Sequence, residues 1–138
     1  MLALTLVAGS RCSGTTEPAA WATLTLVSGN NQTVTIDPVG PLTNFPATVV
    51  VHLDSLGTPM ANGQLSVALY MNGAPGPNGP YTFTTASDGD ASMQLVVSNI
   101  PGPVRIDVSY VRCVKLGFFD CDQYKTFATL SLSAQAVR

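Results

Sequence analysis

Charged side chains are scarce in this chain of 138 residues. Asp, Glu, Lys and Arg together make up 10% of it, against roughly 25% in an average soluble domain. The six Lys and Arg residues are scattered between Arg11 and Arg138, and the net charge is −2. No basic patch can therefore neutralise phosphates, so the composition argues against nucleic-acid binding. Solubility must come from neutral Thr, Ser, Asn and Gln side chains.

Side chains for acid–base and metal chemistry are equally few. His52 is the single histidine and Glu17 the single glutamate. Alternation in residues 46–54 places His52 on the less apolar face. The sequence offers no partner for it, so we predict a solvated or edge-satisfied side chain rather than a catalytic one. Asp88 and Asp90 stand in a turn, and a calcium loop needs more oxygen ligands and a terminal glutamate. The sequence therefore predicts no enzyme, no metal site and no cofactor.

Long apolar runs are missing too, since the run at residues 2–8 is far shorter than the roughly 20 residues that cross a bilayer. Residues 1–20 join this run to a polar linker, in the manner of a secretory signal. Cys12 is then a candidate for lipidation, although Arg11 stands where a lipoprotein signal has a small residue. Alternatively, residues 4–10 (LTLVAGS) form an extra strand, because they nearly repeat residues 24–30 (LTLVSGN).

The chain is rich in the residues that favour strands and turns. Twelve Gly and ten Pro residues punctuate segments rich in Thr and Val, in which apolar and polar side chains alternate. Turn signals recur at strand-length intervals. We therefore predict an all-β fold, an antiparallel β-sandwich of about seven or eight strands, in a single domain over residues 21–138. The expected extended segments are 22–28, 32–36, 46–54, 65–71, 81–85, 91–98, 104–112 and 126–136.

Alternation also predicts which side chains face the core. One apolar face is expected in each of residues 46–54, 65–71 and 104–112, at every second position. In residues 126–136, Phe127 should share a face with Thr129 and Ser131. Residues 81–85 and 91–98 are expected to pair as a hairpin closed by the Asp88-Gly89 turn.

The three cysteines have different settings. Cys113 and Cys121 flank a short loop between two predicted strands. A disulfide across the base of a hairpin is therefore geometrically reasonable in an oxidising compartment. Two buried free thiols are the alternative, whereas two thiolates without further ligands do not make a zinc site. Cys12 is left over, as a free thiol, an intermolecular partner or the lipidation site.

The loop between Cys113 and Cys121 is the candidate contact surface. Its apolar side chains surround Gly117 and are Leu116, Phe118 and Phe119. On a disulfide-closed loop these rings make a pre-organised tip that binds a partner at low entropic cost. Equally, they fold back over the end of the sandwich as a lid on the core.

Three phrases follow one another in a set order: LDSLGTPMANGQLSVAL, YTFTTASDGDASMQLVV and IPGPVRIDVSY. They resemble bacterial immunoglobulin-like domains of the invasin/intimin group, in which an Asp-x-x-Gly-x-Pro turn, a Thr-Thr-x-x-x-Gly-x-Ala segment and a Pro-Gly-x-x-x-Ile/Val-x-Val strand share one sandwich. The resemblance covers residues 21–137. It implies an immunoglobulin-like fold that serves as spacer, stalk or adhesive module in secreted or surface-anchored proteins. The cysteine hairpin is longer than the family's usual final strand pair.

We therefore expect a non-enzymatic structural or interaction module outside the cytoplasm, whether secreted, periplasmic or on the cell surface. Its partner is a protein or a further copy of itself, and a membrane enters only through a lipid on Cys12. The alternative is a self-assembling filament, fibre or coat subunit that exchanges strands or loops. A carbohydrate-binding module has less support, since it needs exposed rings as stacking platforms. The candidates for that role are Trp21, Tyr70, Tyr81 and Tyr124.

Overall fold

The computed structural model describes residues 21–76, 79–114 and 123–138. Most of these residues lie in strands, which confirms the predicted all-β fold, and they include no helix long and apolar enough to cross a membrane. The strands are β1 (Ala22–Ser28), β2 (Gln32–Thr35), β3 (Leu42–Asn44), β4 (Val49–Ser55), β5 (Thr58–Pro59), β6 (Gln64–Met71), β7 (Ala74–Pro75), β8 (Tyr81–Thr84), β9 (Asp90–Met93), β10 (Val96–Ser98), β11 (Gly102–Val114) and β12 (Gln123–Val137).

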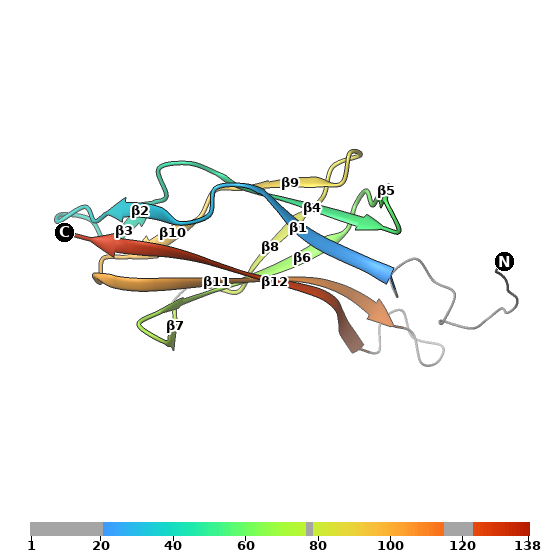
Figure 1. The fold of residues 1–138 in the computed structure, drawn as a ribbon. Coiled ribbons are helices and arrows are strands. Elements are labelled where there is room, and N and C mark those ends of the chain that lie inside the picture. The colour runs from blue at the N-terminus through green and yellow to red at the C-terminus, as the bar shows by residue number, and fades with distance from the viewer. Residues whose placement is uncertain (1–20, 77–78, 115–122) are drawn as a thin grey trace, which may run out of the picture.

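Two sheets carry the fold (Figure 1). In the first sheet, β4 pairs with β1 on one side and with β9 and the short β5 on the other. In the second, the strands run in the order β2, β12, β11, β6 and β8, with the short β7 also beside β6. β3 and β10 form a separate two-stranded ribbon. The pairings are antiparallel except that of β2 with β12, which is parallel.

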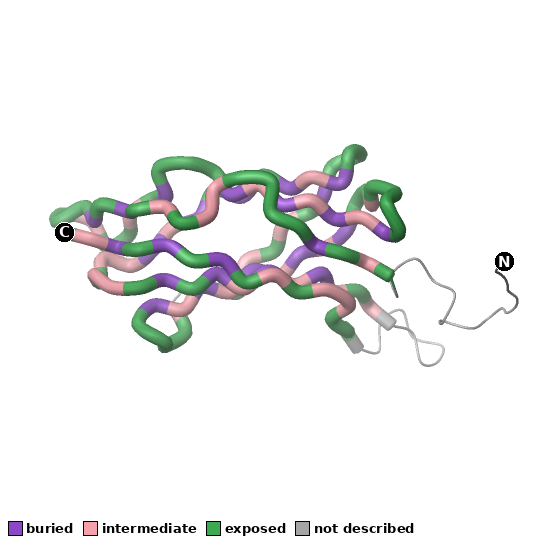
Figure 2. Tube along the Cα trace, in the orientation of Figure 1, coloured by how far each residue is buried: buried purple, intermediate pink, exposed green. Residues whose placement is uncertain are grey.

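The core follows the alternation of the sequence. β4 buries Val49, Val51 and Leu53, whereas the residues between them stay half-exposed. β6 buries every second residue from Leu65 to Met71, and β11 does so from Val104 to Tyr110. Figure 2 shows the resulting alternation of buried and more exposed positions along these strands. The predicted inward faces of these three segments are therefore confirmed.

The turn at Asp88 and Gly89 does not close the hairpin that the sequence predicted. β8 pairs with β6, and β9 pairs with β4, so this turn carries the chain from one sheet to the other. It lies against β4, because the Leu53 N–H donates to the Gly89 carbonyl over 2.8 Å. Gly89 does have the positive φ that the Asp-Gly signal indicates, +85°. An Asp-Gly pair thus predicts the bend, but tertiary packing decides which strand each arm joins.

The segment 91–98 also differs from the prediction, since it is divided between two partners. β9 ends at Met93 and pairs with β4, whereas β10 begins at Val96 and pairs with β3. Between them, the Gln94 side chain donates to the carbonyl of Phe45 over 3.1 Å. Every second residue, from Ala91 to Val97, is apolar and buried through this change of partner, which explains why the sequence predicted one strand.

A β-bulge in β12 changes the predicted position of Phe127. Tyr110 pairs with Ala128 and the next residue of β11 pairs with Thr126, so Phe127 is the extra residue. Its ring lies 6.2 Å from the Tyr110 ring, between centroids, and packs against the core. The prediction that Phe127 shares a face with the exposed Thr129 is therefore wrong, because a bulge interrupts the two-residue period.

The molecule is elongated, with well-separated ends (Figure 1). β1 begins at the end where β5 and the first residues of β12 lie, whereas the C-terminus lies at the opposite end, beside β2 and β3. β12 runs along most of this length with 15 residues, which at about 3.3 Å per residue correspond to roughly 45–50 Å. We call these the β1 end and the C-terminal end.

Candidate functional site

The hairpin of β11 and β12 carries the predicted cysteine site. Past the bulge at Phe127, the two strands stay paired up to Val114 opposite Gln123, with Cys113 opposite Tyr124. The two strands around the predicted loop therefore do pair, although Cys113 lies opposite Tyr124, which is three residues after Cys121 in the sequence. The other predicted site residues lie outside the described residues, so the disulfide, the contact loop and the lipid or thiol role stay predictions. These residues are Cys12, Leu116, Phe118, Phe119 and Cys121.

Exposed apolar side chains lie at the β1 end, where β11 ends and β12 begins. Trp21 is 44% exposed, Leu56 77% and Tyr124 59%. Ala22 pairs with Ser55, which places Trp21 and the turn after β4 at the same end. Leu56 and the glycine after it both have positive φ, 52° and 85°, as in the tight two-residue turns that match the twist of a hairpin. The backbone thus holds Leu56 out into solvent.

A second exposed apolar group lies at the C-terminal end. Val39 is 91% exposed, Leu42 40% and Ile100 49%. These residues come from neighbouring segments, because Leu42 of β3 pairs with Ser98 of β10. Monomers rarely leave apolar side chains clustered at the surface without a binding role, so this end is a second candidate contact surface.

Asn99 fixes the backbone beneath that second group. Its side-chain amide donates to the carbonyls of Asp37 and Gly40, and its Oδ1 accepts from the Thr43 hydroxyl over 2.7 Å. The same hydroxyl accepts from the Asp37 N–H over 2.8 Å. Side-chain hydrogen bonds therefore hold the loop that presents Val39.

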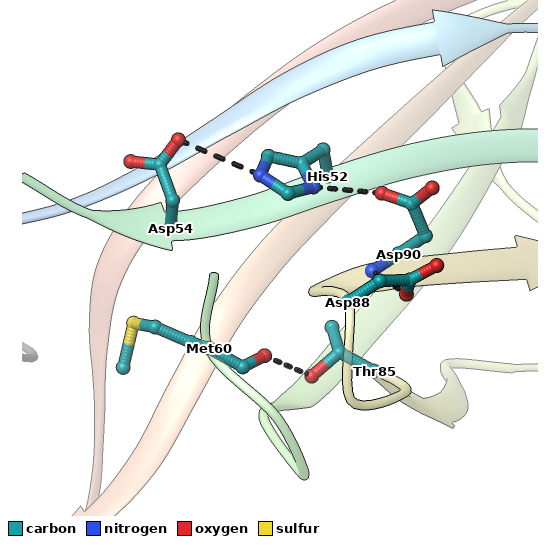
Figure 3. Close-up of polar contacts among 6 residues, drawn as sticks. All are labelled: His52, Asp54, Met60, Thr85, Asp88 and Asp90. Carbon is teal, nitrogen blue, oxygen red and sulfur yellow. Dashed lines mark hydrogen bonds and ion pairs between the residues drawn. The ribbon is translucent and has the colours of Figure 1, made fainter. Parts of the chain in front are cut away.

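A polar cluster surrounds His52 on the outer face of the first sheet (Figure 3). His52 and Asp54 lie two residues apart on β4 and so project from the same face, and Asp90 stands opposite His52 on β9. The ring Nδ1 lies 2.7 Å from Asp90 Oδ1, and Nε2 lies 3.6 Å from Asp54 Oδ2. Asp88 shapes the turn, because its Oδ1 accepts from the Asp90 N–H over 2.9 Å. The cluster was not predicted, since Asp90 is 38 residues from His52 in sequence.

Both ring nitrogens of His52 face carboxylates. A catalytic histidine needs one ring nitrogen aimed at the group that it deprotonates, and here Asp54 lies on the side away from Asp90. The arrangement is suited to fastening β9 to β4 by a hydrogen bond to a charged acceptor. His52, predicted as a solvated or edge-satisfied side chain, is thus half-exposed and has a hydrogen-bond partner on the neighbouring strand. Within the described ranges, no group of three or more His, Cys, Asp or Glu side chains could hold a metal ion.

Thr85 lies near this cluster, but it is buried inside the sandwich. It is only 2% exposed, and its hydroxyl donates to the Met60 carbonyl over 2.6 Å and accepts from the Gly63 N–H over 2.8 Å. Its backbone N–H donates to the Gly63 carbonyl over 3.0 Å, and its carbonyl accepts from the Asn62 N–H over 2.9 Å. Thr85 therefore pins the loop between β5 and β6 to the end of β8.

The four rings considered for carbohydrate stacking differ in their settings. Trp21 and Tyr124 are exposed at the β1 end. Tyr70 has one face covered by the Arg105 guanidinium, 4.2 Å from the ring centroid. Tyr70 also borders a groove of about 300 Å³ beside β7, and Tyr81 is half-buried. Trp21 and Tyr124 are therefore the most exposed of the four rings.

No family model matches this chain, and no curated protein is similar enough to count as a relative. The resemblance to the invasin/intimin group therefore rests on the three sequence phrases. What the residues can do has to be argued from their geometry.

Proposed function

We propose that this chain is an immunoglobulin-like, non-enzymatic module that acts outside the cytoplasm as a structural or interaction unit. The strand order supports the immunoglobulin-like assignment. β1, β4 and β9 share one sheet and β6, β11 and β12 the other, as strands A, B, E and C, F, G do in that fold. β1 pairs with β4 in the first sheet, and β2 pairs with β12 in the second. The first two strands of the domain therefore contribute to different sheets.

One observation carries the proposal: an elongated sandwich exposes apolar side chains at both of its ends. Trp21, Leu56 and Tyr124 are exposed at the β1 end, and Val39 and Ile100 are exposed beside β3 and β10 at the C-terminal end. A sandwich gathers its turns and loops at its two ends, so these are the surfaces that meet a neighbouring domain or partner. Rigid turns and side-chain hydrogen bonds present them, which lowers the entropic cost of binding.

The same observation favours one alternative, a subunit of a self-assembling filament, fibre or coat. Two apolar ends on one rod allow head-to-tail contacts, which generate open filaments. Sedimentation velocity of the full chain distinguishes the two functions. A monomer throughout the micromolar range supports the module. Association that Val39→Ser abolishes and Val27→Ser on the flank of β1 leaves intact supports the assembly subunit.

Location is tested on the protein isolated from its own cells. We expect it outside the cytoplasm, with Cys113 and Cys121 joined, so that a thiol reagent labels these two cysteines only after reduction. The reference is the same protein produced in a reducing cytoplasm, in which both should be labelled without prior reduction. Native protein found in the cytoplasm with both thiols reactive would contradict the proposal.

A further inference from the structure

Among the described residues, partners cover the outer edge of β12 only along its last third. β2 pairs with Ala134–Val137, and the next residue, Ser133, is satisfied by the turn after β1. Its N–H donates to Asn30 Oδ1 over 3.0 Å, and its carbonyl accepts from the Asn31 N–H over 2.8 Å. This fixes the side on which odd-numbered residues of β12 direct their backbone groups.

Thr129 and Ser131 therefore point their backbone N–H and C=O groups away from β11, as Ser133 does, because successive residues alternate. In the described part of the chain, no hydrogen bond reaches these groups. An edge with a row of unpaired donors and acceptors is a template for another strand.

The side chains beside this edge show that the core is not closed there. Phe127, Ala128 and Leu130 are only partly buried, although they pack against the core. On the neighbouring β1, Leu26 is 36% exposed and Val27 55%. A strand added to β12 with apolar residues at every second position would shield these groups from water and satisfy the free backbone.

We propose that residues 4–10 of this same chain occupy the open edge of β12 as an antiparallel strand. They match residues 24–30 at five of seven positions, and β1, formed by the second copy, is a strand of this fold. Leu4 and Leu6 alternate with Thr5 and Val7, so one face of the strand is apolar and suits the side chains beside the edge.

Chain length and direction are compatible with this placement. Residues 4–10 have to connect to β1 through ten residues, 11–20, and a chain of that length reaches at most about 36 Å. β1 begins at the end where β12 also begins. A segment that leads toward this end runs opposite to β12, which leads away from it. The added strand is therefore antiparallel to β12.

Residue-resolved hydrogen exchange by NMR on the full chain tests the proposal. We expect the amides of Thr129 and Ser131 to exchange on the order of 100-fold more slowly than unprotected amides, as strand amides within a sheet do. Leu6→Pro and Val7→Pro, made one at a time, remove N–H groups that point to opposite sides of a strand. At least one of them should abolish the protection. The control Thr16→Pro, within the connecting residues 11–20, should keep it.

The amides of Leu130 and Leu132, which face β11, report whether each variant is folded and should stay protected in all of them. Unprotected Thr129 and Ser131 amides in the full chain would overturn the proposal. So would protection that survives both proline variants. Protection that depends on Leu6 or Val7 but falls on dilution would also overturn it, because a neighbouring molecule would then supply the strand.

Discussion

Replacing Thr85 by Val tests the hydrogen bonds that join β8 to the loop after β5. Val has the shape of Thr, but it can neither donate to the Met60 carbonyl nor accept from the Gly63 N–H. The bond to Gly63 is buried and the bond to Met60 only partly so. The substitution thus removes two hydrogen bonds without opening a cavity.

The expected loss follows from this difference in burial. A buried backbone group left without a partner costs about 1–3 kcal/mol, and this applies in full to the Gly63 N–H. Water can still reach the half-exposed Met60, so its carbonyl adds less, and we expect Thr85→Val to lower the free energy of unfolding by about 2–3 kcal/mol. Thr85→Ser keeps the hydroxyl and loses one methyl group, which costs about 1 kcal/mol.

Urea denaturation of the three proteins measures these losses. With a slope of about 1.5 kcal/mol per molar for a domain of this size, the midpoint should fall by roughly 1.3–2 M in Thr85→Val and by about 0.7 M in Thr85→Ser. Equal slopes are required for the comparison. If Thr85→Val were as stable as Thr85→Ser, burial of the methyl group rather than the hydrogen bonds would explain Thr85, and the reasoning would be wrong.

Two matched pairs of variants test other contacts by the same method. Gly89 and Gly57 share a φ of +85°, but an added Cβ lies 2.6 Å from the Leu53 carbonyl oxygen at Gly89 and meets nothing within 4 Å at Gly57. Gly57→Ala should therefore lower the free energy of unfolding by about 1–2 kcal/mol, and Gly89→Ala should lower it by at least about 2 kcal/mol more. Equal losses would show that the turn at Gly89 shifts to accommodate the methyl group. Asp90→Asn should cost about 1 kcal/mol and Asp54→Asn less than about 0.5 kcal/mol, because their carboxylates lie 2.7 and 3.6 Å from the histidine. The reverse order would contradict the assigned hydrogen bond.

Local pattern was enough to predict strands wherever one face of a segment is buried. The alternation from Leu65 to Met71 identifies β6 and its inward face, because a two-residue period needs no knowledge of the partner strand. Pairing was not predictable in this way. The arms of the Asp88-Gly89 turn join different sheets, and β3 is too short, at three residues, to show a period at all.

The candidate sites also differ in whether they depend on local pattern or on long-range pairing. The cysteine hairpin follows from two local features, the strands on either side and the spacing of Cys113 and Cys121. The His52 cluster depends on pairing β4 with β9 in one register, which brings Asp90 opposite His52. A shift by one residue would turn Asp90 to the other face. Contacts that depend on the register between distant strands therefore could not be predicted from the sequence.

The polar side chains with well-defined hydrogen bonds already connect parts of the domain to one another. This affects where a partner can bind. The hydroxyl of Thr85, the imidazole of His52 and the amide of Asn99 all hydrogen-bond to other parts of the domain. Using any of them for a ligand would break a contact that positions a strand or loop. The exposed apolar groups have no such role, since Val39 and Leu56 contribute little to the core at 91% and 77% exposure. Selection for stability alone does not favour such side chains at two opposite ends, and contact with a neighbour does.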